Sequence, residues 1–135
     1  ALDRGRTGRA LLVETDPAVR AKISETLASM GYATEEAART AEALSKIRSM
    51  TGHYDILIFD CSHVDRNAVA FYNELRAMHR YLPIMITNEA GAEISGDLAK
   101  DDSCAIVLDE ALSREGLRNA LNELRVRCQG AVSEN

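Results

Sequence analysis

The chain has 135 residues, of which 46% are apolar and 27% are charged, and its formal net charge is -5. This composition is typical of one globular domain with its own core and excludes an intrinsically disordered chain. The negative charge argues against a general nucleic-acid surface. The sequence has no apolar run long enough to cross a bilayer, so we expect a cytoplasmic domain with no direct membrane insertion.

The three cysteines, Cys61, Cys104 and Cys128, are odd in number and widely spaced. No disulfide framework is therefore predicted. The first residue is not Met and both ends of the chain are polar, which favours a module of a longer protein. We expect a linker at residues 1–8, one domain over residues 9–128, and a linker or tail at residues 129–135.

Short apolar runs alternate with helical patterns along the chain. Residues 9–14 (RALLVE) predict a strand, and residues 16–31 predict a helix with a regularly spaced apolar face. Asp16 is the expected N-cap of this helix and Pro17 its first helical residue, while Gly31 marks its end.

The next three elements differ in the strength of their signals. Residues 32–38 (YATEEAA) predict a weaker strand, because threonine and glutamate fit a buried ladder poorly. Residues 40–50 predict a helix that begins at a Thr40 cap. Residues 55–59 (DILIF) predict the strongest strand, and their continuous apolarity is typical of a central parallel strand covered on both faces.

The second half of the chain continues the alternation. Residues 68–80 predict a helix, residues 82–87 and 104–108 predict strands, and residues 113–127 predict a final helix. The stretch between the last two strands, residues 88–103, should hold another helix, but it contains two glycines and little apolar periodicity. We expect that helix to be short, frayed or missing.

Five strands that alternate with helices predict an α/β fold, namely a doubly wound five-stranded parallel sheet with helices on both faces and right-handed crossovers. Sites in such sheets lie at the carboxyl ends of the strands. The expected strand ends carry Glu14, Asp60, Thr87 and the pair Asp109 and Glu110. This edge of the sheet is therefore the candidate functional site.

Five segments are informative through their order and spacing. They are LLVETDPAVRAKISETLASMGY, GYATEEAARTAEAL, YDILIFDCSHVDRNAVAFYNELR, LPIMIT and VLDEALSREGLRNAL. Together they resemble the receiver domain of bacterial response regulators and hybrid histidine kinases, over residues 10–127. The resemblance implies the flavodoxin-like receiver fold and an aspartate that becomes an acyl phosphate with the help of magnesium. It also implies a lysine and a hydroxyl side chain that bind the phosphoryl oxygens.

Several positions match this family pattern. Asp60 falls on the phosphoacceptor position, and Glu14 falls on the first acid of the metal-binding pair. Thr15 stands where the second acid belongs. The hydroxyl position falls on Thr87, or on Asn88 in the alternative register.

Other positions depart from the pattern. Glu110 takes the lysine position when the last helix is aligned, and Asp109 takes it when the strand is aligned. The aromatic residue of the last strand is replaced by Val107 or Ile106. An ion pair at about 4 Å is worth roughly 4 kcal/mol at an effective dielectric near 20, so reversing one sign disfavours the phosphorylated state strongly.

These departures predict a degenerate receiver, or pseudoreceiver, that is regulatory and non-catalytic and needs no cofactor. Its expected partners are other domains of the same histidine kinase, or a partner histidine kinase. The alternative is a genuine receiver phosphorylated at Asp60, with Glu14 and Asp60 as residual magnesium ligands.

A second cluster lies around the end of the third predicted helix and contains Arg76, Arg80, Tyr81 and Pro83. Arginine and tyrosine together can stack on a purine and pair with its edge. Some degenerate receivers bind a small ligand in place of a phosphoryl group, so cyclic di-GMP is the ligand that we expect here. The competing interpretation is a solvated surface with an amphipathic tyrosine.

Overall fold

The computed structural model describes residues 8–50, 52–61, 67–88, 98–108 and 113–133. Its elements in chain order are β1 (Gly8–Val13), α1 (Pro17–Ser29), β2 (Tyr32–Ala37), α2 (Thr40–Ser49), β3 (Ile56–Asp60), α3 (Ala68–Met78), β4 (Ile84–Thr87), β5 (Ala105–Leu108) and α4 (Arg114–Ser133). Each strand, and each helix except the one expected within residues 88–103, matches a predicted element.

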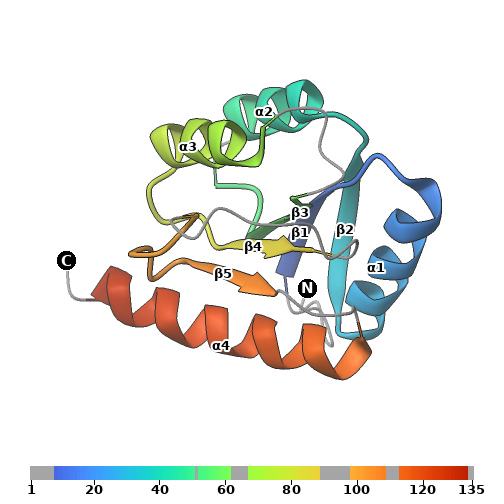
Figure 1. The fold of residues 1–135 in the computed structure, drawn as a ribbon. Helices are drawn as coiled ribbons and strands as arrows, with labels where there is room; N and C mark the ends of the chain where they lie inside the picture. The colour runs from blue at the N-terminus through green and yellow to red at the C-terminus, as the bar shows by residue number, and fades with distance from the viewer. Residues whose placement is uncertain (1–7, 51, 62–66, 89–97, 109–112, 134–135) are drawn as a thin grey trace, which may run out of the picture.

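The strands form one parallel sheet in the order β2-β1-β3-β4-β5. Strand β3 lies at the centre, and all five of its residues are buried, as its apolarity predicted. Figure 1 shows α2 and α3 over one face of the sheet and α1 and α4 over the other. The predicted doubly wound fold is therefore confirmed.

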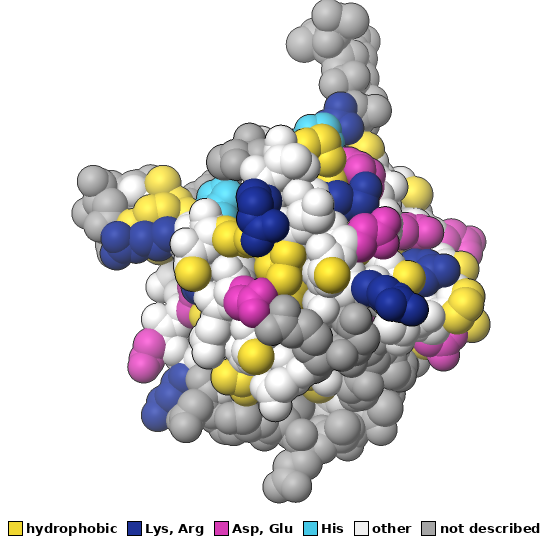
Figure 2. All heavy atoms as spheres, turned by 90° about the horizontal axis from the view of Figure 1, so that it is seen from above, with side chains coloured by type: hydrophobic (Ala, Val, Ile, Leu, Met, Phe, Trp, Pro, Cys, Tyr) yellow, Lys and Arg dark blue, Asp and Glu magenta, His cyan; other side chains and the backbone are white. Residues whose placement is uncertain are grey.

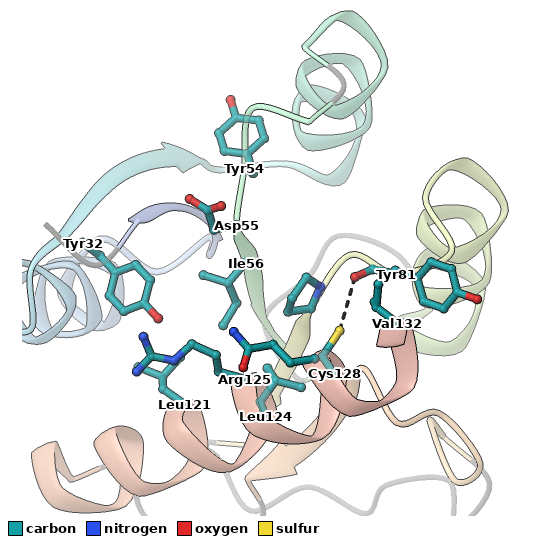
Figure 3. Close-up of a pocket in the computed structure, with 12 residues that line it drawn as sticks. Tyr32, Tyr54, Asp55, Ile56, Tyr81, Leu121, Leu124, Arg125, Cys128 and Val132 are labelled. Carbon is teal, nitrogen blue, oxygen red and sulfur yellow. Dashed lines mark hydrogen bonds between the residues drawn. The ribbon is translucent and has the colours of Figure 1, made fainter. Parts of the chain in front are cut away.

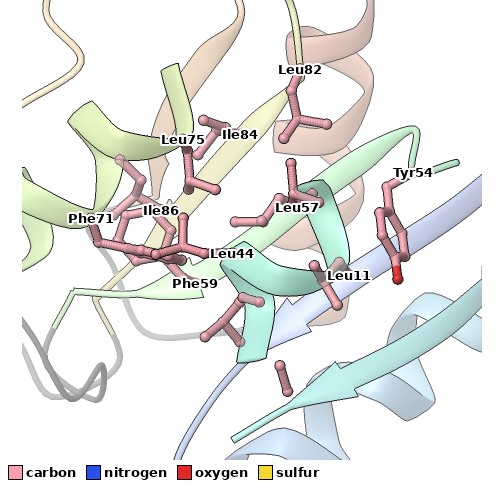
Figure 4. Close-up of a cluster of buried hydrophobic side chains, with 14 of the residues drawn as sticks. Leu11, Leu44, Tyr54, Leu57, Phe59, Phe71, Leu75, Leu82, Ile84 and Ile86 are labelled. Atoms are coloured by element: carbon pink, nitrogen blue, oxygen red, sulfur yellow. The ribbon is translucent and has the colours of Figure 1, made fainter. Parts of the chain in front are cut away.

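Alternation along the strands divides the core into two halves. Leu57 and Phe59 of β3 point to the side of α2 and α3, where Phe59 meets Phe71 edge-on with ring centroids 5.1 Å apart (Figure 4). Leu12 and Ile58 point to the other side and pack against α1 and α4. The hydrophobic effect therefore fixes both which face each strand residue takes and where each helix docks.

The beginning and end of α1 follow the predicted signals. The Asp16 side chain accepts hydrogen bonds from the backbone N–H groups of Ala18 at 2.9 Å and Val19 at 3.4 Å, and Pro17 is the first helical residue. Gly31 has a φ of 93°, a left-handed conformation that glycine adopts without steric cost. The capping interaction is worth about 1 kcal/mol.

Two helix boundaries differ from the prediction. The N-cap of α2 is Arg39, whose side chain makes no capping hydrogen bond, and Thr40 is already the buried first helical residue. Helix α4 continues to Ser133 and so includes most of the stretch that we expected to be a tail. Cys128, just beyond the predicted helix end, is buried, whereas Gln129, Gly130 and Val132 beyond it are exposed.

Two cysteines form a disulfide, which corrects the expectation of unpaired thiols. Cys104, directly before β5, is bonded to Cys128 of α4, with Cα atoms 4.4 Å apart. Cys61 is a free thiol. The pairing joins positions separated by 24 residues in the sequence, and only the folded topology brings them together.

The predicted weak helix within residues 88–103 falls mainly on residues 89–97, which lie outside the described residues. The described remainder of this segment, residues 98–104, consists mostly of turns, and Leu98 is buried in the core. In the part of the chain that the structure describes, no helix is long and apolar enough to span a membrane.

The surface over α2 and α3 mixes charges of both signs. Figure 2 shows acidic and basic side chains interspersed on this face, with apolar side chains between them. A mixed surface of this kind produces little long-range electrostatic steering of a charged polymer.

Candidate functional site

Three polar side chains follow one another at the carboxyl ends of the central strands. The register of β1 with β3 places Glu14, one residue past β1, beside Asp60. Asp60 is paired with Thr87 in the register of β3 with β4. Since Leu12 and Ile58 face the α1 and α4 side, Glu14 and Asp60, two residues further along, belong to that same face.

Asp60 and Thr87 are in direct contact. The Thr87 hydroxyl donates a hydrogen bond of 2.8 Å to Asp60 Oδ2, and each residue is only 1% exposed. Asn88 is also buried, but its Oδ1 accepts a hydrogen bond from the Cys61 thiol at 3.4 Å. Thr87, one of the two residues considered for the hydroxyl position, therefore contacts Asp60 directly.

Glu14 serves the turn between β1 and α1. Glu14 is completely buried, and its Oε2 accepts a hydrogen bond of 2.9 Å from the backbone N–H of Asp16. The Glu14 backbone N–H donates to the carbonyl of Ala37, and its carbonyl accepts from the Arg20 guanidinium at 2.8 Å. Arg20 Nε also lies 3.6 Å from Glu36 Oε1. This network holds the first acid of the site against the end of β2.

A magnesium ion fits these residues poorly. Magnesium prefers six oxygen ligands in octahedral geometry, usually with at least one or two carboxylates and several waters. Here one Glu14 oxygen accepts a backbone N–H and one Asp60 oxygen accepts a hydroxyl, and the residue after Glu14, Thr15, carries no carboxylate. Within the described ranges, no three histidine, cysteine, aspartate or glutamate residues are grouped so that they could hold a metal ion.

The predicted replacements of the lysine, Asp109 and Glu110, lie outside the described residues. The two candidates for the aromatic position are both aliphatic side chains of β5 that are partly buried. Val107 packs against the cluster under α2 and α3, and Ile106 packs against the cluster under α1 and α4.

The second predicted cluster contains an arginine whose donors are already used. Arg76 Nε lies 2.7 Å from Asp102 Oδ2. Its Nη1 donates to the carbonyls of His79 at 3.0 Å and Leu82 at 2.7 Å, and its Nη2 donates to the carbonyl of Cys104 at 3.0 Å. Arg76 thus ties the end of α3 to the entrances of β4 and β5, and it has little capacity left for a ligand.

Asp102 is the partner that sequence reasoning missed. It accepts hydrogen bonds from the Arg76 guanidinium, the Tyr72 hydroxyl and the Cys104 backbone N–H. Burial of Asp102 favours its neutral form, but these hydrogen bonds outweigh it and hold its pKa below the usual value. Burial and the hydrogen bond to Asp102 raise the pKa of Tyr72 to about 12. The local sequence gives no signal for this pairing, because Arg76 and Asp102 are 26 residues apart.

The second cluster lies around two hollows, and Tyr81 lines both of them. The Arg80 guanidinium lies 5.2 Å from the centre of the Tyr81 ring, and both line an open depression of about 510 Å³ that also includes Arg76 and Lys100. Pro83 lines only the other hollow, of about 710 Å³. The structure therefore brings Arg76, Arg80 and Tyr81 to one depression, and it places Pro83 in the other hollow.

The sequence matches one known protein family. The model of the response regulator receiver domain matches residues 10–100 of this chain, which is more than half of its length. The matched range contains Glu14, Asp60 and Thr87, the row of polar residues described above. The comparison with curated protein sequences gave no match.

Several solved structures have the same fold. The chemotaxis protein CheY4 of Vibrio cholerae is 24% identical, with 87% of this chain and 98% of that chain covered and a TM-score of 0.72. The magnesium-bound receiver domain of a sensor histidine kinase from Pseudomonas aeruginosa PAO1 is 23% identical, with coverages of 87% and 96% and a TM-score of 0.69. CheY of Borrelia burgdorferi, in a complex with CheX, BeF3 and magnesium, is 16% identical, with coverages of 93% and 98% and a TM-score of 0.75.

Proposed function

Because this chain belongs to the response regulator receiver family of two-component signalling, we propose that it is a pseudoreceiver, a regulatory domain that acts by docking and not by phosphorylation. The observation that carries the proposal is the state of the acidic site. Asp60 is buried against the Thr87 hydroxyl, Glu14 is committed to the turn before α1, and Thr15 replaces the second metal-binding acid.

Electrostatics supports the same proposal. Phosphoryl transfer depends almost entirely on positioning and on neutralising negative charge. The sequence supplies an acid, Glu110 or Asp109, where the family has a lysine, and it lacks one metal-binding carboxylate. An ion pair at about 4 Å is worth roughly 4 kcal/mol at an effective dielectric near 20, and an acid in place of the lysine turns that attraction into a repulsion, so the acyl phosphate at Asp60 should form poorly.

The test is to incubate the protein with acetyl phosphate and magnesium and to follow its intact mass. We expect no phosphorylated species, and no change in the amide spectrum when beryllofluoride and magnesium are added. The Asp60→Asn variant is the matched control. A mass increase in the wild type that is absent from this variant would overturn the proposal.

The second candidate function is a genuine receiver phosphorylated at Asp60. One observation favours this candidate: the Asp60 carboxylate and the Thr87 hydroxyl are adjacent at the carboxyl edge of the sheet. A phosphoryl group on Asp60 would need a hydroxyl at this place. Phosphorylation of Asp60 would have to break their hydrogen bond of 2.8 Å. The mass experiment separates the two candidates directly.

We place the domain in a histidine kinase, with the other domains of that kinase or a partner kinase as its docking surface. Among the structural neighbours, one is the receiver domain of a sensor histidine kinase and another is the receiver domain of the hybrid histidine kinase CckA. The expected domain limits, residues 9–128, require one adjustment in this proposal, because α4 runs on to Ser133. Co-expression with the kinase core encoded by the same gene, followed by copurification, tests the docking.

The ligand that we propose for the docking equilibrium is cyclic di-GMP, bound by Arg80 and Tyr81. Their stacked arrangement leaves a guanidinium edge for the O6 and N7 atoms of guanine. Lys100 adds positive charge to the same depression, which Asp101 and the ion-paired Asp102 also line. A ligand shifts an equilibrium only through different affinities for its two states. Calorimetric titration should give saturable heat with cyclic di-GMP and none with GMP.

The same titration can reject the proposal that cyclic di-GMP binds. We would reject it if no heat were measured up to about 100 μM cyclic di-GMP, because binding weaker than this has little regulatory value. Binding that survives both Arg80→Ala and Tyr81→Ala would keep the ligand but reject the site. Arg48→Ala, a change in an exposed side chain of α2, serves as the charge-matched control.

A further inference from the structure

An open hollow of about 710 Å³ lies at the end of the sheet opposite to Asp60 (Figure 3). Its lining includes Tyr32, the first residue of β2, Ile56, the first residue of β3, and Pro83, directly before β4. Helix α4 forms the remaining wall. The hollow is within the size range of small-molecule sites in proteins, about 300–1,000 Å³.

The floor of this hollow is apolar. Ile56, Leu121 and Leu124 belong to the buried core and are at most 3% exposed, and Pro83 and Val132 add apolar surface beside them. An apolar group that covers this floor would gain a favourable free energy of roughly 25 cal/mol for each Å² of apolar area buried. The hydrophobic effect therefore favours a ligand with an apolar or ring-shaped body.

One side of the hollow carries positive charge without a carboxylate partner. The Arg125 guanidinium reaches toward the Tyr32 hydroxyl (Figure 3). Its hydrogen bond goes to the neutral side-chain oxygen of Asn122 at 3.0 Å. In the described part of the chain, Arg125 forms no ion pair. Asp55 is the carboxylate of the lining, and its Oδ2 accepts the backbone N–H of Arg9 at 2.8 Å.

A second arginine extends this positive side. Arg118, two helical turns before Arg125, lines a smaller adjoining hollow of about 180 Å³ together with Tyr32 and Arg125. It too forms no ion pair with any described residue. Burial raises the pKa of Tyr32, although Arg125 opposes this shift, so the hydroxyl remains a protonated donor. Arg125 and Tyr32 therefore line both the apolar hollow and the smaller one, and Arg118 lies beside them in the smaller one.

We propose that this hollow binds a small apolar acid, a molecule with a hydrophobic body and one carboxylate or phosphate group. The body would lie on Ile56, Leu121 and Leu124. The acidic group would accept hydrogen bonds from Arg125, Arg118 and the Tyr32 hydroxyl, since guanidinium groups bind carboxylate and phosphate through paired N–H donors. The site needs neither phosphorylation of Asp60 nor Arg80, although Tyr81 lines both hollows, so it goes beyond the function proposed above.

The experiment uses the whole chain and three naphthalene probes, namely 2-naphthoate, 1-naphthyl phosphate and the neutral 2-naphthol. Ligand-dependent melting temperature and amide chemical shifts are measured for each, because a ligand that binds only the folded state stabilises it by mass action. We expect at least one of the two acids to raise the melting temperature and to shift the amide resonances of Leu121 and Arg125. The neutral probe should bind at least tenfold more weakly. The stronger of the two acids identifies the acidic group that the site accepts.

Two variants make the test decisive. Arg125→Gln should weaken binding of the preferred acid at least tenfold, and its own melting temperature should match the wild type because the side chain is exposed. Arg80→Ala should leave this binding unchanged. Equal binding of the neutral probe, full binding by Arg125→Gln, loss of binding in Arg80→Ala, or no binding of either acid would each overturn the proposal.

Discussion

Asp60 and Asp102 are both carboxylates withdrawn from water, but the protein holds them differently. Asp60 lies at the carboxyl edge of the sheet and accepts a hydrogen bond from a neutral hydroxyl, that of Thr87. Asp102 lies before β5, paired with the Arg76 guanidinium and the Tyr72 hydroxyl. The family pattern directs attention to Asp60, yet the ion-paired network that joins three parts of the fold is built around Asp102. A site defined by family chemistry and a site that holds the fold together are separate here.

The largest effect should come from breaking the Asp102 network. Arg76→Met keeps the length of the side chain but leaves Asp102 without its ion-pair partner and removes the side-chain donor to three carbonyls. The carbonyls of His79 and Cys104 keep a backbone N–H donor, from Leu82 and Ile84 respectively. Removing one partner of a mostly buried pair costs about 3 kcal/mol. We expect a loss of this size in the free energy of unfolding, measured by urea denaturation.

Arg80→Met is the control for this prediction, because Arg80 is an exposed neighbour on the same segment. It should change the free energy of unfolding by less than about 0.5 kcal/mol. A loss in Arg76→Met no larger than in Arg80→Met would show that the network contributes nothing to stability.

The next effect is the pH dependence that Asp102 confers. Its pKa is lowered in the folded state, so its stabilising contribution is present above the unfolded pKa of about 3.9 and is lost as pH falls through the folded value. Wild type should exceed Asp102→Asn in stability most clearly near pH 7, and the difference should shrink below about pH 4. Urea denaturation over this pH range measures it. A difference that grows toward low pH would contradict the assignment.

A smaller effect is expected from the Tyr72 hydroxyl. Tyr72→Phe removes one hydrogen bond to Asp102 and should cost about 1 kcal/mol. The pKa of Tyr72 is raised to about 12, so its stabilising contribution is present below the unfolded pKa of about 10 and is lost as pH rises through the folded value. Ultraviolet titration of phenolate should therefore lose a late-ionising component in this variant.

Burial and the neighbouring Glu35 carboxylate raise the pKa of Tyr54 to about 12 as well. Tyr54 should supply the late-ionising phenolate that remains in the Tyr72→Phe variant. An unchanged titration curve in that variant would show that the Tyr72 hydroxyl ionises normally.

The smallest effect should come from Asp60→Asn. The amide keeps an oxygen that can accept the Thr87 hydroxyl, and it removes a buried negative charge. We expect the free energy of unfolding to change by less than about 1 kcal/mol, in either direction. A loss as large as that of Arg76→Met would show that Asp60, too, has an essential structural role and would remove the contrast between the two carboxylates.

Local patterns were enough to predict most of the fold. The Asp16 cap, the Pro17 start and the continuous apolarity of β3 depend on a few adjacent residues, and each was confirmed. The side-by-side placement of Asp60 and Thr87 also followed, because parallel strands bring their carboxyl ends to one edge.

Features that depend on distant residues could not be predicted in this way. The Cys104 and Cys128 disulfide and the partner of Arg76 require knowing how β5, α3 and α4 pack. Arg76 was predicted as part of a ligand-binding cluster, and its role as a link between backbone carbonyls appears only when the loops around it are in place. The extension of α4 was missed because Gly130 and the polar residues near it indicate a helix end.

The disulfide also changes the connectivity of the chain. Its bond closes residues 104–128 into a covalent ring that contains β5 and most of α4. A single peptide-bond cleavage inside this ring leaves both fragments attached to each other, whereas a cleavage before it separates the chain into two pieces. On a denaturing gel without reductant the first product keeps the mass of the whole chain, and only thiol reduction divides it.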